Sequence, residues 1–107
     1  MVEIRALDGT NWMEFLSLRT VVFIIGRSDC SDCHHLYQEM HSIELPAHWV
    51  VGKLDLDQPN LGGFRNANPW LEHIDMVPFT TVFVDGEMAA HWAGVDTTRL
   101  KESVQSL

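Results

Sequence analysis

The chain has 107 residues, of which 46% are hydrophobic, and its fifteen acidic and seven basic residues give a formal net charge of −8. This length is typical of one domain, so we expect a single domain over residues 1–107, and the hydrophobic content excludes a disordered chain. The basic residues are scattered along the sequence rather than clustered, which argues against nucleic acid as a partner.

The sequence also argues against a membrane or an extracellular setting. No apolar run approaches the ~20 residues that cross a bilayer, and the N-terminus, Met1–Arg5, lacks the basic start and apolar stretch of a signal peptide. Two cysteines are too few for the disulfide scaffold of a small secreted protein. We therefore expect a cytoplasmic protein with no membrane partner.

The N-terminal part predicts a strand, a short helix and a buried strand. Residues 4–7 form the first strand, and Asn11 is then a candidate N-cap with Glu14 three residues later. Helical spacing places three large side chains on one face, Trp12, Phe15 and Leu16. The run Thr20–Ile25 is continuously β-branched and apolar, which is typical of a strand buried on both faces.

The two cysteines follow this strand after a turn over residues 26–29. A helix is predicted from the cysteine segment as far as Pro46, because apolar side chains recur at helical spacing, namely Cys33, Leu36, Tyr37 and Met40. Residues 49–56 predict another strand. Residues 58–68 are rich in Gly, Asn and Pro and predict a loop.

The remaining chain predicts two helices around a hairpin. Asn68 followed by Pro69 is typical of a helix start, here for residues 70–74. The dipeptide Asp85-Gly86 predicts a tight hairpin between strands 79–84 and 87–93.

The last helix is expected to begin at Asp96 or Thr97, since both are good N-cap residues, and to turn Leu100, Val104 and Leu107 inward. The predicted order is β-α-β-α-β-α-β-β-α. Early alternation of strands and helices, followed by a hairpin, predicts an α/β fold with a mixed central sheet sandwiched by helices.

Cys30 and Cys33 are the only cysteines, and they stand three residues apart where the buried strand gives way to a helix. Unpaired N–H groups and the helix dipole favour a thiolate on Cys30. Cys33, one turn later, is placed to attack a mixed disulfide made by Cys30 and release the partner reduced. The spacing therefore predicts dithiol–disulfide exchange.

Beyond the cysteines, the chain resembles the thioredoxin family along nearly its whole length. The matching segments are the buried strand leading into CSDC at 30–33, VGKLDLDQ at 51–58, MVPFT at 76–80, VFVDGE at 82–87, and Gly94. The resemblance implies a thioredoxin-like fold in which Pro78 is a cis proline facing the cysteines. It also implies that the backbone of Val77 pairs with substrate as an added strand.

Two departures from the family's pattern lie beside the cysteines. Thioredoxins usually carry Trp before the first cysteine and Gly-Pro between the two, whereas this chain has Asp29, Ser31 and Asp32. The family's buried aspartate is replaced by Ile24, although the lysine that accompanies it is retained as Lys53. A third departure is an inserted segment at 59–74, between the third strand and Pro78.

These departures bear on the acidity of the Cys30 thiol. The carboxylates of Asp29 and Asp32 oppose a thiolate, because like charges repel, whereas a protonated His34 favours one. Lys53 is a further candidate for tuning the thiol pKa. We hypothesise that Cys30 is less acidic than in typical thioredoxins, which makes the pair a reductant rather than an oxidant.

Three other functions fit parts of the sequence. A thioredoxin-fold adaptor with idle cysteines accounts for the missing Trp and the missing buried carboxylate. A C-x-x-C-H motif at 30–34 matches c-type haem attachment, with Met76 or another methionine as the second axial ligand, but such cytochromes are helical. A zinc site has candidate ligands in Cys30, Cys33, His34 or His35, and His41.

The predicted function is that of a thiol–disulfide oxidoreductase that reduces protein disulfides. Cys30 is the expected nucleophile, Cys33 the resolving thiol, and Val77 with Pro78 the docking edge. No metal or organic cofactor is required, since a reductase or a low-molecular-weight thiol supplies the electrons.

Overall fold

The structure is a computed structural model that describes residues 2–107. At its centre is a five-stranded sheet in the order β1-β3-β2-β4-β5. The strands are β1 (Ile4–Ala6), β2 (Thr20–Gly26), β3 (Trp49–Asp55), β4 (Phe79–Val84) and β5 (Glu87–Ala93). β3 runs parallel to β1 and β2, whereas β4 is antiparallel to both β2 and β5, so the predicted mixed sheet is confirmed.

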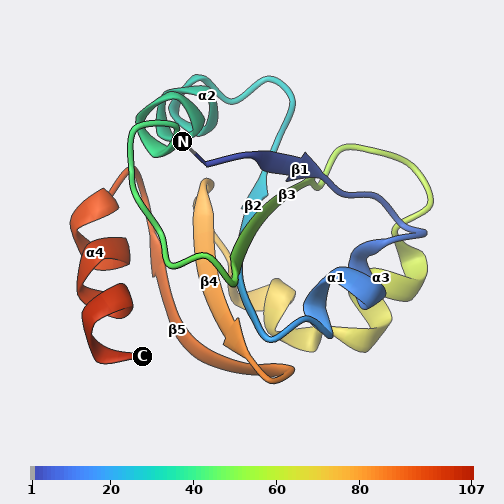
Figure 1. Cartoon of the computed structure of the whole chain (residues 1–107). Coiled ribbons are helices and arrows are strands. Elements are labelled where there is room, and N and C mark those ends of the chain that lie inside the picture. Colours follow the sequence, from blue (N-terminus) through green and yellow to red (C-terminus); the bar gives the residue numbers. More distant parts are fainter. Residues whose placement is uncertain (1) are drawn as a thin grey trace.

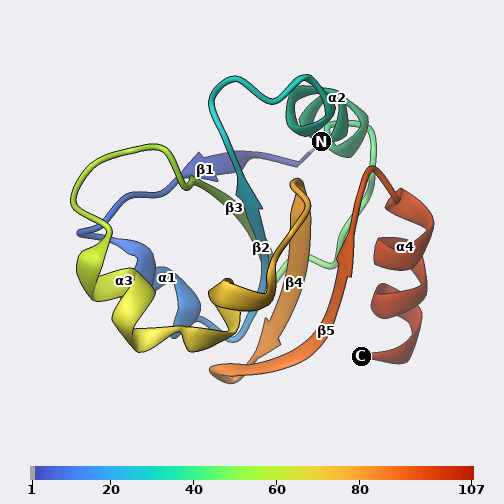
Figure 2. The ribbon, with the colours of Figure 1, turned by 180° about the vertical axis from the view of Figure 1, so that it is seen from behind.

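Helices cover both faces of this sheet (Figures 1 and 2). One face carries α1 (Trp12–Leu16), α3 (Gly62–Ala67) and the 3-10 helix η1 (Pro69–His73). The other carries α2 (Ser31–Met40) and α4 (Thr97–Ser106). The buried side chains form two corresponding clusters, which we call the α1/α3 cluster and the α2/α4 cluster. The predicted α/β sandwich is confirmed.

Strand β2 divides its side chains between the two clusters. All seven of its residues are buried. Val21, Phe23 and Ile25 join the α1/α3 cluster, whereas Val22 and Ile24 join the α2/α4 cluster, as the period-two geometry of a strand requires. Full burial of one such side chain stabilises the fold by about 1.5–3 kcal/mol. This burial on both faces holds β2 in place, and with it the strand end from which the cysteine segment begins.

The prediction of a loop over 58–68 is wrong in part, because α3 occupies its second half. Phe64 is fully buried, with its ring centroid 5.2 Å from that of Trp12 and 5.8 Å from that of Phe23. Leu61, three residues earlier, is also buried. The loop was predicted from the Gly and Asn content of the segment, because these residues have weak helix propensity. The burial of Leu61 and Phe64 outweighs that weak propensity.

Other boundaries also differ from the predictions. Helix α2 ends at Met40 rather than near Pro46, because tight turns from Ser42 N–H to the Glu39 carbonyl and from Ile43 N–H to the Met40 carbonyl close it. The predicted helix at 70–74 is the 3-10 helix η1, with Pro69 in its first turn.

Helix ends show two further corrections and one confirmed cap. Asn11 does not cap α1 with its side chain, because its Oδ1 accepts a hydrogen bond from Asp8 N–H instead. Leu107 was expected to face inward but is exposed, because it follows the last residue of α4. Asp96 caps α4 by accepting a hydrogen bond from Arg99 N–H at 3.2 Å.

The described part of the chain, residues 2–107, has no helix with the length and apolar character needed to cross a bilayer.

Candidate active site

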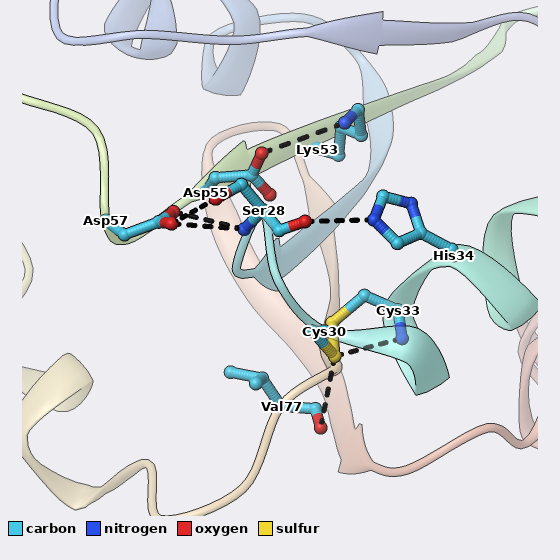
Figure 3. The surroundings of a disulfide bond; sticks show 8 residues. All are labelled: Ser28, Cys30, Cys33, His34, Lys53, Asp55, Asp57 and Val77. Carbon is cyan, nitrogen blue, oxygen red and sulfur yellow. Dashed lines mark hydrogen bonds and ion pairs between the residues drawn. A yellow bond between two sulfur atoms is a disulfide. The ribbon is translucent and has the colours of Figure 1, made fainter.

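Cys30 is the N-cap of helix α2, directly after the loop that leaves the end of β2. Its side chain and that of Cys33 are joined by a disulfide, with 5.2 Å between the two Cα atoms (Figure 3). The Cys30 sulfur accepts a hydrogen bond from Cys33 N–H at 3.0 Å. A sulfur thus occupies the place of the usual N-cap oxygen, where the N–H groups of the first turn stabilise negative charge.

The two sulfurs differ in exposure. Cys33 is fully buried in the α2/α4 cluster, whereas Cys30 is half-buried and packs against that cluster from outside. Exchange with a large partner requires one accessible sulfur and one sheltered sulfur. The burial pattern of this pair meets that requirement.

Val77 and Pro78 lie beside the accessible sulfur. The carbonyl oxygen of Val77 is 4.0 Å from the Cys30 sulfur (Figure 3), and the peptide bond between Val77 and Pro78 is cis. Val77 is half-buried and packs against both clusters, while Pro78 is buried just before β4. The structure therefore brings the two cysteines together with Val77 and Pro78, the expected docking edge, although more than forty positions of sequence separate the two pairs.

A hydrogen-bond network holds the loop between β2 and Cys30. Asp57, just beyond β3, accepts from both the N–H group and the hydroxyl of Ser28, the N–H bond being 3.1 Å long. The carbonyl of the same Ser28 pairs with His34 Nε2 at 3.0 Å (Figure 3). Hydrogen bonds from Ser28 lower the pKa of Asp57. The loop is thus bound to β3 on one side and to α2 on the other.

The residues expected to tune the thiol pKa lie in different settings. Asp29 and Asp32 are exposed, on either side of Cys30. His34 is also exposed, but its ring nitrogen is engaged by the Ser28 carbonyl. Lys53 is half-buried, with Nζ 3.8 Å from Asp55 Oδ2 and 5.0 Å from the centre of the Tyr37 ring.

Four residues of this region were missed from the sequence, namely Ser28, Tyr37, Asp55 and Asp57. A signal was available for three of them, because Asp55 ends β3, Asp57 follows that strand and Ser28 follows β2. The carboxyl ends of adjacent parallel strands meet at one edge of a sheet. Asp55 and Lys53 are also two residues apart on one strand, hence on one face.

The candidate zinc ligands do not assemble. Cys30 and Cys33 are bonded to each other, while His41 lies just past the far end of α2 and pairs with the Val2 carbonyl through Nδ1. Within residues 2–107 no three His, Cys, Asp or Glu side chains gather as a metal site requires.

Comparisons with known proteins bear on the fold. The sequence matches no protein-family model and no curated protein. Solved thioredoxins do match the structure. Spinach chloroplast thioredoxin f, short form, is 16% identical with a TM-score of 0.77, over 97% of this chain and 92% of that one. Thioredoxin O2 from Arabidopsis thaliana in its oxidised state is 25% identical with a TM-score of 0.69, over 97% and 93% of the two chains.

A third solved structure, the oxidised thioredoxin of Plasmodium falciparum, is 16% identical with a TM-score of 0.72 and is covered to 97%, as is this chain. The resemblance inferred from the motifs is therefore confirmed in three dimensions. This chain has the thioredoxin fold, and its two cysteines form the disulfide of a C-x-x-C motif at the start of helix α2.

Proposed function

We propose that this protein is a thiol–disulfide oxidoreductase that reduces disulfides in other proteins, with residues 1–107 working as one thioredoxin-like domain. The observation that carries the proposal is the asymmetric sulfur pair. Cys30 is accessible at a helix N-terminus beside the Val77 carbonyl, and Cys33 is sealed one turn behind it.

The proposed reaction has two exchange steps. The Cys30 thiolate attacks one sulfur of the substrate disulfide, forming a mixed disulfide and releasing the other substrate sulfur as a thiolate. The Cys33 thiolate then attacks the Cys30 sulfur, which closes the internal disulfide and releases the second substrate sulfur. The substrate gains two electrons, and the protein loses them. A reductase or a low-molecular-weight thiol returns the protein to its dithiol form.

Val77 and Pro78 form the proposed docking edge. The Val77 carbonyl near the Cys30 sulfur is available to accept a hydrogen bond from an extended substrate segment, in the manner of strand addition. Main-chain pairing of this kind holds a substrate disulfide beside the attacking sulfur without demanding one particular side-chain sequence. A broad range of protein disulfides is the expected substrate class.

Charged groups near the site are proposed to set the direction of electron flow. Asp29 and Asp32 disfavour a thiolate on Cys30 by repulsion, whereas the reduced form of an oxidising pair needs that thiolate stabilised. Lys53, and His34 when it is protonated, supply the opposing positive charge. We therefore propose a reductant. The cytoplasm is the proposed compartment, because reducing conditions there keep such a pair supplied with electrons. No metal or organic cofactor takes part.

An insulin reduction assay with dithiothreitol as the electron source tests the proposal. We expect catalysis by the wild type and none by Cys30→Ser. We expect Cys33→Ser to accumulate a mixed disulfide with substrate that mass spectrometry can identify. A wild type that accelerates insulin reduction no more than Cys30→Ser does would sink the enzyme assignment. That result would favour the adaptor function, in which the same edge binds partners without turnover.

A further inference from the structure

The burial of Cys33 creates a requirement for proton transfer. In the resolving step its thiol must lose a proton before the sulfur can attack Cys30, and in the reverse direction its thiolate must regain one. The Cys33 side chain has no exposed surface, so bulk water does not reach it. Leaving an isolated charge on a buried sulfur is costly. A proton acceptor within the protein would remove that cost.

Two polar groups and the Cys33 sulfur surround the same space beside Gly26, the last residue of β2. A Cβ atom on Gly26 would lie 3.1 Å from the Cys33 sulfur, 2.7 Å from the Tyr37 hydroxyl oxygen and 3.5 Å from Asp55 Oδ1. The three groups therefore converge on one point from two elements, α2 and β3. A side chain at position 26 would occupy the space between them.

Both polar groups are buried and unpaired. Neither Asp55 Oδ1 nor the Tyr37 hydroxyl has a hydrogen-bond partner among residues 2–107, although buried polar atoms are almost always paired. The other carboxylate oxygen, Asp55 Oδ2, faces the Lys53 ammonium at 3.8 Å, and 22% of the Asp55 side chain is exposed. The Asp55 side chain thus extends from the space beside Gly26 to solvent.

We propose that Asp55 accepts the proton of the Cys33 thiol during resolution and returns it when the disulfide is reduced. The inference rests on the proposed function, since it concerns the same exchange. The Cys33 thiol and the Asp55 carboxylate become a thiolate and a carboxylic acid, and the thiolate attacks Cys30. The proton then leaves to solvent past Lys53. Ile24, at the position of the family's buried aspartate, cannot play this part.

The neighbouring groups are consistent with this role. Tyr37 can donate a hydrogen bond but does not accept the proton, because burial and the nearby charge of Asp55 raise the pKa of its phenol well above the ordinary value. Lys53 places a positive charge beside the carboxylate. Of the other titratable groups nearby, His34 and Asp57 are engaged by Ser28, and Asp29 and Asp32 are exposed. Asp55 is therefore the group best placed to accept a proton from Cys33.

The reaction of the reduced protein with Ellman's reagent separates the two exchange steps. Attack by Cys30 releases one thionitrobenzoate, and attack by Cys33 on the resulting mixed disulfide releases a second in a phase that does not depend on reagent concentration. For Asp55→Asn we expect the first phase within twofold of wild type. The rate of the second phase should fall by about 100-fold or more near neutral pH, as the loss of a general base does, and should rise in proportion to hydroxide concentration.

Glu39→Gln is the matched control, because it removes one carboxylate from the exposed side of α2, where Glu39 pairs with His35. Both phases should stay at wild-type rates. A second phase in Asp55→Asn within twofold of wild type overturns the inference. Because this reagent needs no protein partner, the result stands apart from insulin reduction, whose failure would overturn the proposed function instead.

A spectroscopic measurement covers the case of a variant that does not fold. In the reduced wild type, the ¹³Cβ shift of Cys33 should titrate in two steps, one from its own thiol and one transmitted from the Asp55 carboxyl group. Asp55→Asn should lose the second step. A single step in the wild type overturns the inference without any variant.

Discussion

Both faces of the sheet bury mainly aliphatic and aromatic side chains, but the α2/α4 cluster also contains a sulfur of the cysteine pair. The α1/α3 cluster is built from aromatic and aliphatic side chains, with Phe64 in edge contact with Trp12 and Phe23. The α2/α4 cluster contains the Cys33 sulfur, and the Tyr37 hydroxyl and Asp55 Oδ1 lie unpaired at the same end of the sheet. Packing on the first face stabilises the fold, whereas the second face accepts unpaired polar atoms where the proposed chemistry takes place.

Removing an aromatic ring from the α1/α3 cluster should have the largest effect on stability and little effect on the intrinsic chemistry. Phe64→Ala should lower the free energy of unfolding by about 3–5 kcal/mol, because it leaves a cavity among packed rings. Urea denaturation measures the loss. The rate of Cys30 attack on Ellman's reagent, measured where the variant is still folded, should stay within twofold. A large change in that rate would show that the two faces are not separable.

Filling the space beside Gly26 should reverse that pattern. In Gly26→Ala the new Cβ would lie 2.7 Å from the Tyr37 hydroxyl and 3.1 Å from the Cys33 sulfur, so these side chains must shift. We expect a loss of about 1–3 kcal/mol in unfolding free energy. With Ellman's reagent, the rate of the second phase (attack by Cys33) should fall more than the rate of the first phase (attack by Cys30). Equal slowing of both phases would contradict the inference that the space beside Gly26 affects the reaction of Cys33 and not that of Cys30.

Removing the acidic side chains that flank Cys30 tests the tuning hypothesis at the accessible end of the site. The double variant Asp29→Asn with Asp32→Asn should have a lower Cys30 pKa than wild type, because the repulsion of a thiolate is removed. The pH dependence of iodoacetamide alkylation measures this pKa. A wild-type pKa well below about 7, the value typical of thioredoxin, would contradict the hypothesis of a less acidic thiol.

The smallest expected effect concerns the loop before Cys30. Hydrogen bonds from Ser28 lower the pKa of Asp57, so its charge stabilises the folded state above the ordinary carboxyl pKa. That contribution is lost as pH falls through the lowered value. As the pH is lowered from about 7 to about 3, the free energy of unfolding should therefore fall less in Asp57→Asn than in the wild type. Thermal melting at a series of pH values measures this difference.

Asp8→Asn offers a comparison for this last variant. Asp8 is also exposed, and hydrogen bonds from Thr10 lower its pKa, yet it lies outside the cysteine region. Both variants should flatten the pH dependence of stability, but only Asp57→Asn should alter the rate of Cys30 attack. A change of that rate in Asp8→Asn would mean that overall charge, and not the loop, controls the sulfur.

Local sequence patterns determined much of this structure. The apolar run at 20–25, the turn dipeptide Asp85-Gly86 and the cysteine spacing at a helix start each depend on neighbouring residues, so each could be predicted without the fold. Both turn residues adopt positive φ, as a tight hairpin requires. The placement of Pro78 near the cysteines came from a family resemblance, not from local physics.

Tertiary packing decided the rest. Helix α3 forms in a Gly-rich and Asn-rich segment because Phe64 finds a buried site between Trp12 and Phe23, and no local pattern expresses that gain. Likewise, helical spacing relates Cys33 to Tyr37, but no local pattern relates them to Gly26 or Asp55. The four residues surround one space only because β2 and β3 pair in parallel and α2 packs across them. Such long-range contacts depend on the register of whole elements, whereas the patterns in a sequence report only the preferences of neighbouring residues.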